Sequence, residues 1–501
     1  MTRKNANEFK SACREFLSMQ GITALRPYGR EVGVAEPTKK NKGELIEDVV
    51  AILAGEIPST PRSTRGAPVK DDFVDPKITE YIKNLCALYP IERAEKGNDL
   101  FDMEARLQNV KENERVLTVE DPRAKELEKN GVREIFKGQL ETLNGVSMLL
   151  PLSCMDSANK IIVSVDMIRA YDLREGDVIT CYAEKRNAVL VATTILTINE
   201  LVADYFRRGS FDELSACYPR EKINFSEGKR HATITEKCLE WLVPVGKGQR
   251  GLVIAPPKAG KSSLLLEAVR SAKTLNKGMK VFTLLVDQSP ENIGQFRHFV
   301  GEENLVYTTY EDEPERQVFA ADFLLRRAKR YAECGMDILL IVDSFTALAH
   351  AFNDTDASAG GKVLLGGMES KTVQYIKRYF GAARCFERGG SITILGSLSI
   401  DTGNPADELL KAELSAIGNL EIRLSGELAR RRVYPAIDLL HTEGKRSGAL
   451  LGVKGEAFDG VLRGEYLPAY GIEALLELIS ASQTAEELEE KIYKQVKNKK
   501  K

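Results

Sequence analysis

The sequence has few of the residues that build metal and redox centres. Its eight cysteines are scattered along the chain with no two close together, and its four histidines show no ligand spacing. The cysteines are Cys13, Cys86, Cys154, Cys181, Cys217, Cys238, Cys334 and Cys385. Zinc ribbons and dithiol redox motifs need two thiols within about two to four residues. We therefore expect reduced thiols, and any metal ion to arrive with a ligand such as a nucleotide.

Long apolar runs and an excess of charge are also missing. No stretch of about 18 apolar residues is present, and the first nine residues are polar rather than signal-peptide-like, so we expect a cytoplasmic protein without a membrane span. The 71 basic and 73 acidic side chains give a net charge of −2. This balance excludes a global cationic field, so any site for a polyanion must be local.

Composition divides the 501 residues into several segments, as expected for about three domains. We predict a small basic helical module (1–57), a flexible linker (58–76), a helical connector (77–133), a small β-barrel (134–200), a second connector (201–229), an α/β domain (230–475) and a charged, solvated helical tail (476–501).

The N-terminal module combines two amphipathic stretches with turn-rich sequence. Helices are expected at 9–19 and 44–53, separated by turns at 27–30 and 36–40. Residues 1–70 carry 12 basic and 8 acidic side chains, a balance of +4. Such a helix–loop–helix module suits contact with nucleic acid, and a solvated appendage or docking element is an equally good alternative.

A barrel is predicted from short β-type runs at 160–165, 177–182 and 188–192. Turn sequences separate them, such as Asn144-Gly145 and Glu175-Gly176. Strands this short and evenly spaced are typical of a small closed barrel.

The strongest local motif is a strand that leads into a phosphate-binding loop and then a helix, at 251–269. Backbone N–H groups of the loop and helix start, at Ala259, Gly260 and Ser263, can face phosphate oxygens. Lys261 is expected to reach the β- and γ-phosphates, and the Ser262 hydroxyl to bind Mg²⁺. The usual first glycine of this motif is replaced by an alanine at position 255.

A second buried strand, 337–343, ends in Asp343. An aliphatic strand of this kind is typical of the centre of a parallel sheet, whose carboxyl edge binds ligands. We therefore predict that Asp343 organises Mg²⁺ opposite the phosphate loop.

With these motifs in order, residues from about 135 to 475 resemble the bacterial transcription termination factor Rho family. The matching segments are 218–225 (YPREKINF), 243–251 (VPVGKGQRG), 255–262 (APPKAGKS), 343–346 (DSFT), 361–367 (GKVLLGG), 379–384 (YFGAAR), 400–403 (IDTG) and 432–438 (RVYPAID). Residues 25–30 with 44–47 resemble the helix–loop–helix module at the front of such proteins.

The resemblance implies a multidomain chain: a RecA-like P-loop ATPase core preceded by an OB-fold RNA-binding domain and a helical nucleic-acid-binding-like module. It implies a homohexameric, RNA-dependent ATPase and helicase that takes ATP and Mg²⁺, acts on single-stranded RNA and works in termination, with RNA polymerase as a possible partner.

Four further residues acquire roles by the same resemblance. Lys258 would bind the triphosphate, and Tyr434 would stack on adenine. Lys362 would grip RNA phosphates from a central-pore loop. Arg446 would be the arginine finger reaching the neighbouring subunit's γ-phosphate, with Lys445 as the alternative because the comparison needs a one-residue insertion there.

The catalytic pattern of the family is broken after the strand at 281–286. Gln288 stands where the family carries the glutamate that deprotonates the attacking water, and Ser289 replaces an arginine. An amide cannot accept that proton, and loss of a general base costs about 10²–10⁴ in rate. Ala347 replaces another arginine, and Glu291 is an alternative carboxylate for the lost task.

The barrel departs as well. Its expected RNA-stacking aromatics are replaced in the run Val146-Ser147-Met148, and residues 135–199 carry 6 basic and 7 acidic side chains. Neither feature favours a groove that follows RNA phosphates.

We therefore predict a Rho-like ATP-dependent RNA-binding protein acting in transcription termination, with hydrolysis impaired by Gln288. The alternative is a non-hydrolysing ATP-binding regulatory paralogue that works by binding RNA, DNA or protein.

Overall fold

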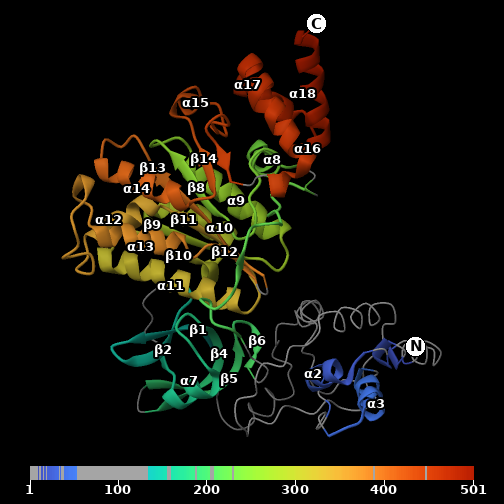
Figure 1. Ribbon diagram of the computed structural model, residues 1–501. Coiled ribbons are helices and arrows are strands. Elements are labelled where there is room, and N and C mark those ends of the chain that lie inside the picture. The colour runs from blue at the N-terminus through green and yellow to red at the C-terminus, as the bar shows by residue number, and fades with distance from the viewer. Residues whose placement is uncertain are drawn as a thin grey trace. The chain divides into compact units, whose positions relative to one another are not determined.

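The computed structural model describes residues 10, 13–14, 16–18, 20–32, 34, 39–53, 134–154, 160–186, 189–203, 208–227, 229, 231–387, 390–445 and 448–500. The chain divides into two compact units, Met1–Lys125 and Glu126–Lys501 (Figure 1). The linker expected at 58–76 and the connector expected at 77–133 lie outside the described residues.

The first unit contains α2 (Ile22–Val32) and α3 (Lys42–Leu53). The prediction of a turn at 27–30 is wrong, because α2 runs through Pro27. Proline inside a helix costs about 3 kcal/mol. Leu25 and Tyr28 on the same helix are buried in a small apolar core, and burial of such side chains contributes about 1.5–3 kcal/mol each, which offsets that cost.

The second unit begins with a closed, mostly antiparallel sheet. Its strands are β1 (Glu134–Leu143), β2 (Val146–Leu150), β3 (Ile161–Ile162), β4 (Val178–Arg186), β5 (Val189–Ile198) and β6 (Leu201–Val202), in the order β3-β2-β1-β4-β5-β6. A further pairing of β3 with β5 closes the sheet on itself. The β1–β2 turn has positive φ at both Asn144 and Gly145, as tight two-residue hairpins require.

The strand expected at 160–165 is shorter than predicted. Ser164 accepts a hydrogen bond from the Met167 backbone N–H at 3.3 Å and caps helix α7 (Val165–Tyr171), so the strand ends at Ile162.

The larger sheet contains nine strands in mostly parallel order. They are β7 (Ala216–Cys217), β8 (Arg250–Ala255), β9 (Lys280–Gln288), β10 (Leu305–Thr309), β11 (Asp337–Asp343), β12 (Arg384–Phe386), β13 (Ser391–Ser399), β14 (Leu420–Arg423) and β15 (Glu443–Gly444). The main path runs β10-β9-β11-β13-β8-β14-β15, and β12 joins β13 to β7. The predicted strand ending at Asp343 is therefore present as β11, buried between β9 and β13.

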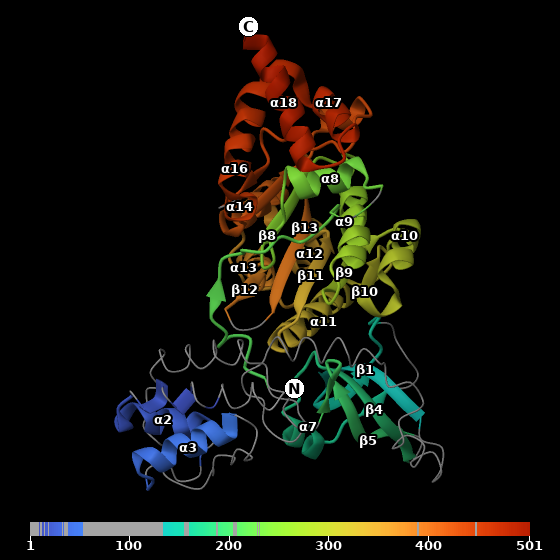
Figure 2. The same cartoon turned by 90° about the vertical axis from the view of Figure 1, so that its right-hand side faces the viewer.

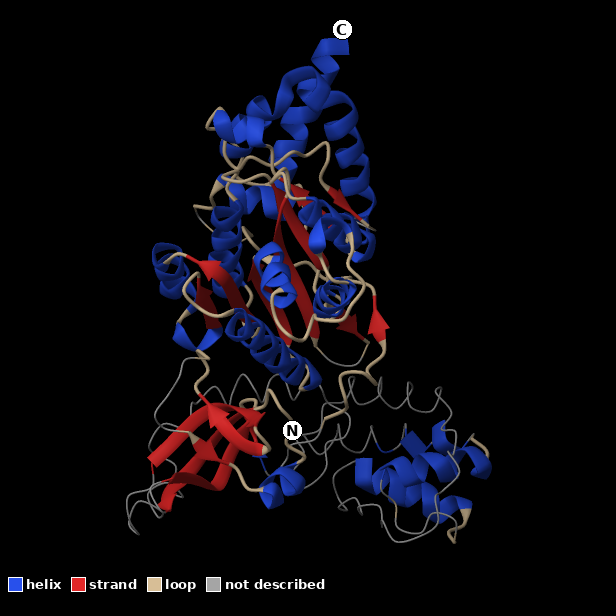
Figure 3. Cartoon of the chain, turned by 90° about the vertical axis from the view of Figure 1, so that its left-hand side faces the viewer, coloured by secondary structure: helices blue, strands red, loops and turns tan. Residues whose placement is uncertain are grey.

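Helices cover both faces of this sheet (Figures 2 and 3). One apolar core joins the sheet to α8 (Ile234–Trp241), α9 (Lys261–Leu275), α10 (Pro290–Val300), α16 (Gly448–Val461), α17 (Leu467–Ser480) and α18 (Ala485–Lys500). The other joins it to α11 (Pro314–Glu333), α12 (Phe345–Asn353), α13 (Ser370–Phe380) and α14 (Pro405–Ile417). Short α15 (Gly426–Arg430) follows β14. Residues of β8 alternate between the two cores, with Val253 in the first and Leu252 in the second.

The expectation of a solvated tail is wrong for one face of α18. Leu488 and Ile492 are fully buried in the first core, and Val496 is nearly so. Their spacing of four residues places them on one stripe of the helix, which the many charges of this segment obscure in the sequence. Helix α17 also crosses the boundary expected at residue 475.

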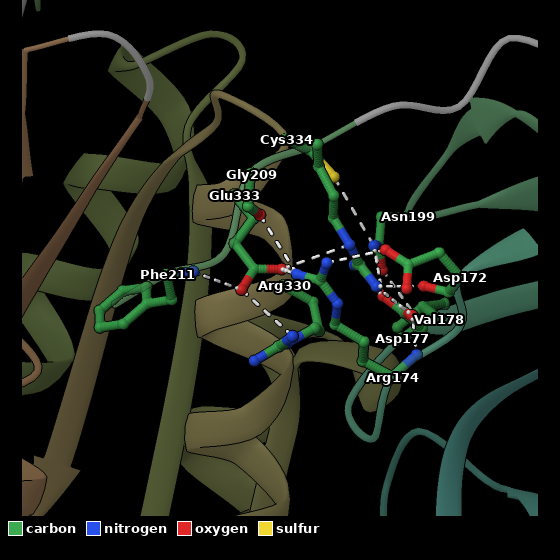
Figure 4. Close-up of polar contacts among 11 residues, drawn as sticks. Asp172, Arg174, Asp177, Val178, Asn199, Gly209, Phe211, Arg330, Glu333 and Cys334 are labelled. Carbon is green, nitrogen blue, oxygen red and sulfur yellow. Dashed lines mark hydrogen bonds and ion pairs between the residues drawn. The ribbon is translucent and has the colours of Figure 1, made fainter. Parts of the chain in front are cut away.

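A buried ion-pair network attaches the closed sheet to α11 (Figure 4). Arg208 donates to Asp177 Oδ2 at 2.7 Å, and its Nε lies 3.4 Å from Glu333 Oε2. All three side chains are fully buried. Glu333 also pairs with Arg330 at 3.1 Å and accepts the Phe211 backbone N–H at 2.9 Å.

A second polar contact lies earlier on α11. Arg327 donates to Gln139 Oε1 at 2.7 Å and to the Leu152 carbonyl at 2.6 Å. Burial lowers the pKa of this guanidinium to about 10. Helix α11 is followed directly by β11, the strand that ends in Asp343. Both contacts therefore join the closed sheet to the helix that leads into this strand.

Among the helices in the described ranges, none has the length and apolarity needed to cross a membrane.

Candidate functional site

The phosphate-type loop connects β8 to α9 at the carboxyl edge of the large sheet. Gly260 precedes α9 with φ of 96°, a conformation that glycine adopts without strain. Ala255, which replaces the usual first glycine, is the last residue of β8 and is fully buried in the first core. An alanine in place of glycine therefore adds a buried methyl group to the first core. The amino end of α9 presents backbone N–H groups suited to an anion.

Three side chains meet at the carboxyl edge of the large sheet: Ser262 of α9, Asp343 of β11 and Ser397 of β13. Ser262 Oγ donates to Asp343 Oδ2 at 2.6 Å, and Ser397 Oγ donates to Asp343 Oδ1 at 2.5 Å. This contact across the sheet is possible because only β13, which carries Ser397, separates β11 from β8. Asp343 is buried, with 2% of its surface exposed. The structure thus brings together the predicted Ser262 and Asp343.

Lys261 lies beside this cluster. Its Nζ donates to Ser399 Oγ. Burial lowers the pKa of the ammonium, and the carboxylates of Asp343 and Asp407 oppose that shift. The sequence analysis missed the roles of Ser397 and Ser399. Ser397 and Ser399 are two residues apart near the end of β13, so they lie on the same face of the strand. This polar pair after an apolar run was the signal available in the sequence.

Asp407, in the first turn of α14, was also missed. Its carboxylate lies 2.7 Å from His350 Nε2 and accepts a hydrogen bond from Thr402 Oγ1 at 2.6 Å. It is almost completely buried. Thr402, in the loop after β13, thus holds a carboxylate that acts on the pKa of Lys261.

Gln288 lies at the end of β9 with both ends of its amide engaged. Its Nε2 donates to the Val286 carbonyl at 3.2 Å and to the Asp343 carbonyl at 3.4 Å. Its Oε1 accepts from Asn292 Nδ2 at 2.6 Å. Nothing in the sequence analysis had singled out Asn292, which lies one turn into α10.

Local hydrogen bonds engage the other residues of the broken catalytic pattern, Ser289, Glu291 and Ala347. Ser289 caps α10 by accepting the Asn292 backbone N–H at 3.4 Å. Glu291 is exposed, and hydrogen bonds with its own backbone and with Ser289 lower the pKa of its carboxyl. Ala347, in the first turn of α12, donates its backbone N–H to Ser344 Oγ at 3.1 Å.

Tyr434 lies beside the phosphate-type loop. A Cβ atom placed on Gly260 would lie 3.6 Å from Cε1 of its ring. The ring is 45% exposed, and its hydroxyl donates to the Ala429 carbonyl at 3.4 Å. Lys258 and Ser263, on the same loop and helix start, are exposed.

Lys362 lies elsewhere, in an exposed loop between α12 and α13. Its backbone N–H donates to Ser370 Oγ at 3.1 Å. This loop packs closely on α14, since a Cβ on Gly366 would lie 2.3 Å from the Ala406 nitrogen. Arg446 lies outside the described residues, and the alternative Lys445 donates its backbone N–H to the Asn419 carbonyl at 2.9 Å.

Residues 236–442 match the model of the ATP synthase alpha/beta family, nucleotide-binding domain. This match agrees with the parallel sheet and loop described above, and the larger domain is a RecA-like P-loop ATPase core. Among solved structures, an ATPase from the type III secretion system of pathogenic bacteria aligns with a TM-score of 0.48 and 18% identity, over 63% of this chain and 94% of that one.

Curated relatives share more sequence. The transcription termination factor Rho of Karelsulcia muelleri is 35% identical over 303 residues, which are 59% of this chain and 79% of the relative. The Rho of Streptomyces coelicolor is 36% identical over 319 residues, 63% of this chain and 75% of the relative. The Rho of Salmonella typhimurium is 33% identical over 332 residues, 65% of this chain and 78% of the relative. With this identity over most of each relative's length, the chain belongs to the Rho family of transcription termination factors.

Proposed function

We propose that this chain is an ATP-dependent, RNA-binding Rho-type ATPase and helicase that acts in transcription termination and hydrolyses ATP slowly. The observation that carries the proposal is a contrast within one site. Ser262 and Asp343 are joined by a 2.6 Å hydrogen bond beside Lys261, an arrangement that suits a nucleotide with Mg²⁺, whereas the last side chain of β9 is an amide, Gln288.

The binding half of the site suits a nucleoside triphosphate with Mg²⁺. The loop at Lys258, Ala259 and Gly260, and the start of α9 at Lys261 and Ser263, would hold the phosphates, and Tyr434 would stack on the adenine. Mg²⁺ prefers oxygen ligands, and the Ser262 hydroxyl and Asp343 carboxylate supply two at the carboxyl edge of the sheet. A bound Mg²⁺–ATP would supply the transferable phosphoryl group; the chain's part is to orient and neutralise it.

At position 288 the hydrolysing half carries an amide in place of a proton acceptor. The Gln288 oxygen accepts from Asn292, and its nitrogen faces main-chain carbonyls. An amide in this position can orient a water molecule but cannot take its proton. We expect the missing base alone to lower the rate by about 10²–10⁴.

For RNA, we assign the closed sheet as an OB-fold domain and the N-terminal helices as an additional nucleic-acid-binding module. Val146 and Met148 on β2 offer no aromatic platform. RNA contact would therefore depend more on Lys362, whose loop also exposes Val363 and Leu365. A cytoplasmic homohexamer would place Lys362 in a central pore, and Arg446 would reach a neighbouring subunit's nucleotide. RNA polymerase is a candidate partner.

The alternative is a regulatory paralogue that binds ATP without hydrolysing it and acts by binding RNA, DNA or protein. The two hydrogen-bonded ends of the Gln288 amide favour it, because they hold a group that cannot act as a base in the catalytic position.

Phosphate release measured with and without single-stranded RNA distinguishes the two functions. The Rho-type proposal expects slow release that RNA accelerates; the alternative expects none above the background of Lys261→Ala. Nucleotide binding is measured in parallel on the wild type, Lys261→Ala and the control Lys277→Ala, which changes an exposed lysine just after α9. Equal binding by wild type and Lys261→Ala would contradict both functions.

A further inference from the structure

Two cysteines that lie far apart in the sequence face each other across a strand pair. Strand β7 pairs antiparallel with β12, and Cys217 is directly opposite Cys385. Strand β12 in turn pairs with β13 at Ile392 and Ser391. Cys217 lies within the connector that leads from the closed sheet, so the pair lies where this connector joins the large sheet.

We propose that Cys217 and Cys385 form a dithiol site that hydroperoxides oxidise to a disulfide, reversibly fastening the connector to the large sheet. This inference is independent of ATP hydrolysis, because the pair lies beside the starts of β11 and β13, at the edge opposite the phosphate-type loop.

The strand register meets the geometric requirement for a disulfide. Directly opposed residues of antiparallel strands have Cα atoms about 4.5–5.5 Å apart, and disulfides span Cα separations of about 4.4–6.8 Å. The bond can therefore form without a change of register. Both side chains are partly exposed, so a small oxidant has access.

The surroundings of the pair assign different tasks to the two sulfurs. Burial, together with the hydrogen bond and charge of Cys217 and the charges of Asp337 and Glu221, raises the pKa of Cys385 to about 12. Cys385 therefore keeps its proton, so we assign the attack on the peroxide to Cys217. Lys247 pairs with both Asp337 and Glu221, at 2.8 and 2.7 Å, and limits their repulsion of a thiolate.

Oxidation then proceeds in two balanced steps. The Cys217 thiolate attacks one peroxide oxygen; the S–O bond forms, the O–O bond breaks, and hydroxide leaves and is protonated to water. The Cys385 sulfur next attacks the Cys217 sulfur; the S–S bond forms, the S–O bond breaks, and the leaving hydroxide takes the Cys385 proton as a second water. Two thiols and one hydrogen peroxide thus give one disulfide and two waters.

The new bond would restrain a junction that is already closely packed. The turn before β8 lies against Cys385, since a Cβ on Gly248 would be 2.4 Å from the Cys385 nitrogen. The connector that carries Cys217 also carries Arg208 of the buried network on α11. A disulfide would therefore hold both ends of this connector, and we expect slower proteolysis within it.

The test uses the full-length reduced chain treated with hydrogen peroxide. Thiols are counted under denaturing conditions and cross-linked peptides are mapped by mass spectrometry. We expect two thiols to be lost and restored by dithiothreitol, with one peptide pair joining Cys217 to Cys385. The matched variants are Cys217→Ser and Cys385→Ser, which abolish that pair, and Cys334→Ser, another partly exposed cysteine, which leaves it intact.

The wild-type peptide map decides the question even if a variant fails to fold. Retention of all thiols, joining of other cysteines instead, or oxidation of Cys217 to the sulfinic acid without a joined peptide would each overturn the proposal.

Discussion

Asn292 Nδ2 donates a 2.6 Å hydrogen bond to the side-chain oxygen of Gln288, one helical turn away. This contact fixes which end of the amide faces the site, because the Gln288 nitrogen then meets the Asp343 carbonyl. The donor would serve a carboxylate at position 288 equally well. Its second oxygen would face the Val286 and Asp343 carbonyls with no proton to donate, so a glutamate at this position has to turn that oxygen away from them.

Gln288→Glu is expected to raise ATP turnover by about tenfold or more, since a positioned general base contributes about 10²–10⁴ in rate. Steady-state phosphate release in the presence of single-stranded RNA measures the effect. Gln288→Ala is the control, which removes the amide without supplying a base and gives no increase. An unchanged rate in Gln288→Glu, with nucleotide binding intact, would show that the amide does not limit hydrolysis.

Tyr434→Ala is expected to weaken ATP binding, because the ring next to Gly260 is placed to stack on a base. Stacking of a base on an aromatic ring is worth about 1–3 kcal/mol, or about a 5- to 150-fold change in affinity. Tyr434→Phe keeps the ring and loses only the hydrogen bond to the Ala429 carbonyl, so its affinity should stay close to that of the wild type. Titration with a fluorescent ATP analogue measures both variants; equal weakening in the two would assign the effect to the hydroxyl.

The sequence was sufficient to predict the parts of the site that depend on local pattern. The apolar run before Asp343 predicted a central strand, and its carboxylate does lie against Ser262. Contacts that depend on neighbouring strands could not be predicted in this way. Ser397 reaches Asp343 only because the strand order places β13 beside β11, which no local spacing encodes.

Burial explains the errors in the fold. Pro27 and the charged residues of α18 locally favour a turn and a solvated helix, but apolar side chains on the same segments pack into cores formed by other elements. The opposed pair Cys217 and Cys385 shows the same limit, because their proximity depends on a strand register between distant segments. Tertiary contacts of this kind outweigh local preference.

Arg208→Ala should loosen the attachment of the closed sheet to α11. The substitution leaves the buried carboxylates of Asp177 and Glu333 without this partner. Removal of one member of a buried ion pair costs about 3–5 kcal/mol. Urea denaturation of the full chain measures the loss, and Arg169→Ala, an exposed arginine on α7, should change stability by about 0.5 kcal/mol or less. Equal effects of the two variants would show that the network contributes little.

Because of Glu236, we expect the free energy of unfolding to decrease at acid pH. Burial alone would raise its pKa, but hydrogen bonds from Lys229, Ser271, the Thr233 backbone and Arg270 lower it below 4.5 in the folded chain. The unfolded chain therefore binds this proton more readily, so the stability that Glu236 contributes is present above pH 4.5 and is lost as the pH falls through the folded-state pKa.

Glu236→Gln tests this directly. The variant should unfold at a lower temperature than the wild type near pH 7, because it weakens a buried charge pair with Lys229 at 2.6 Å. Between about pH 7 and about pH 3.5 it should lose less stability than the wild type, because it has no carboxylate to protonate at this position. Thermal unfolding at several pH values measures both effects, with the exposed Glu227→Gln as the control that keeps the wild-type profile. Parallel acid-side losses in wild type and Glu236→Gln would assign the pH dependence to other carboxylates.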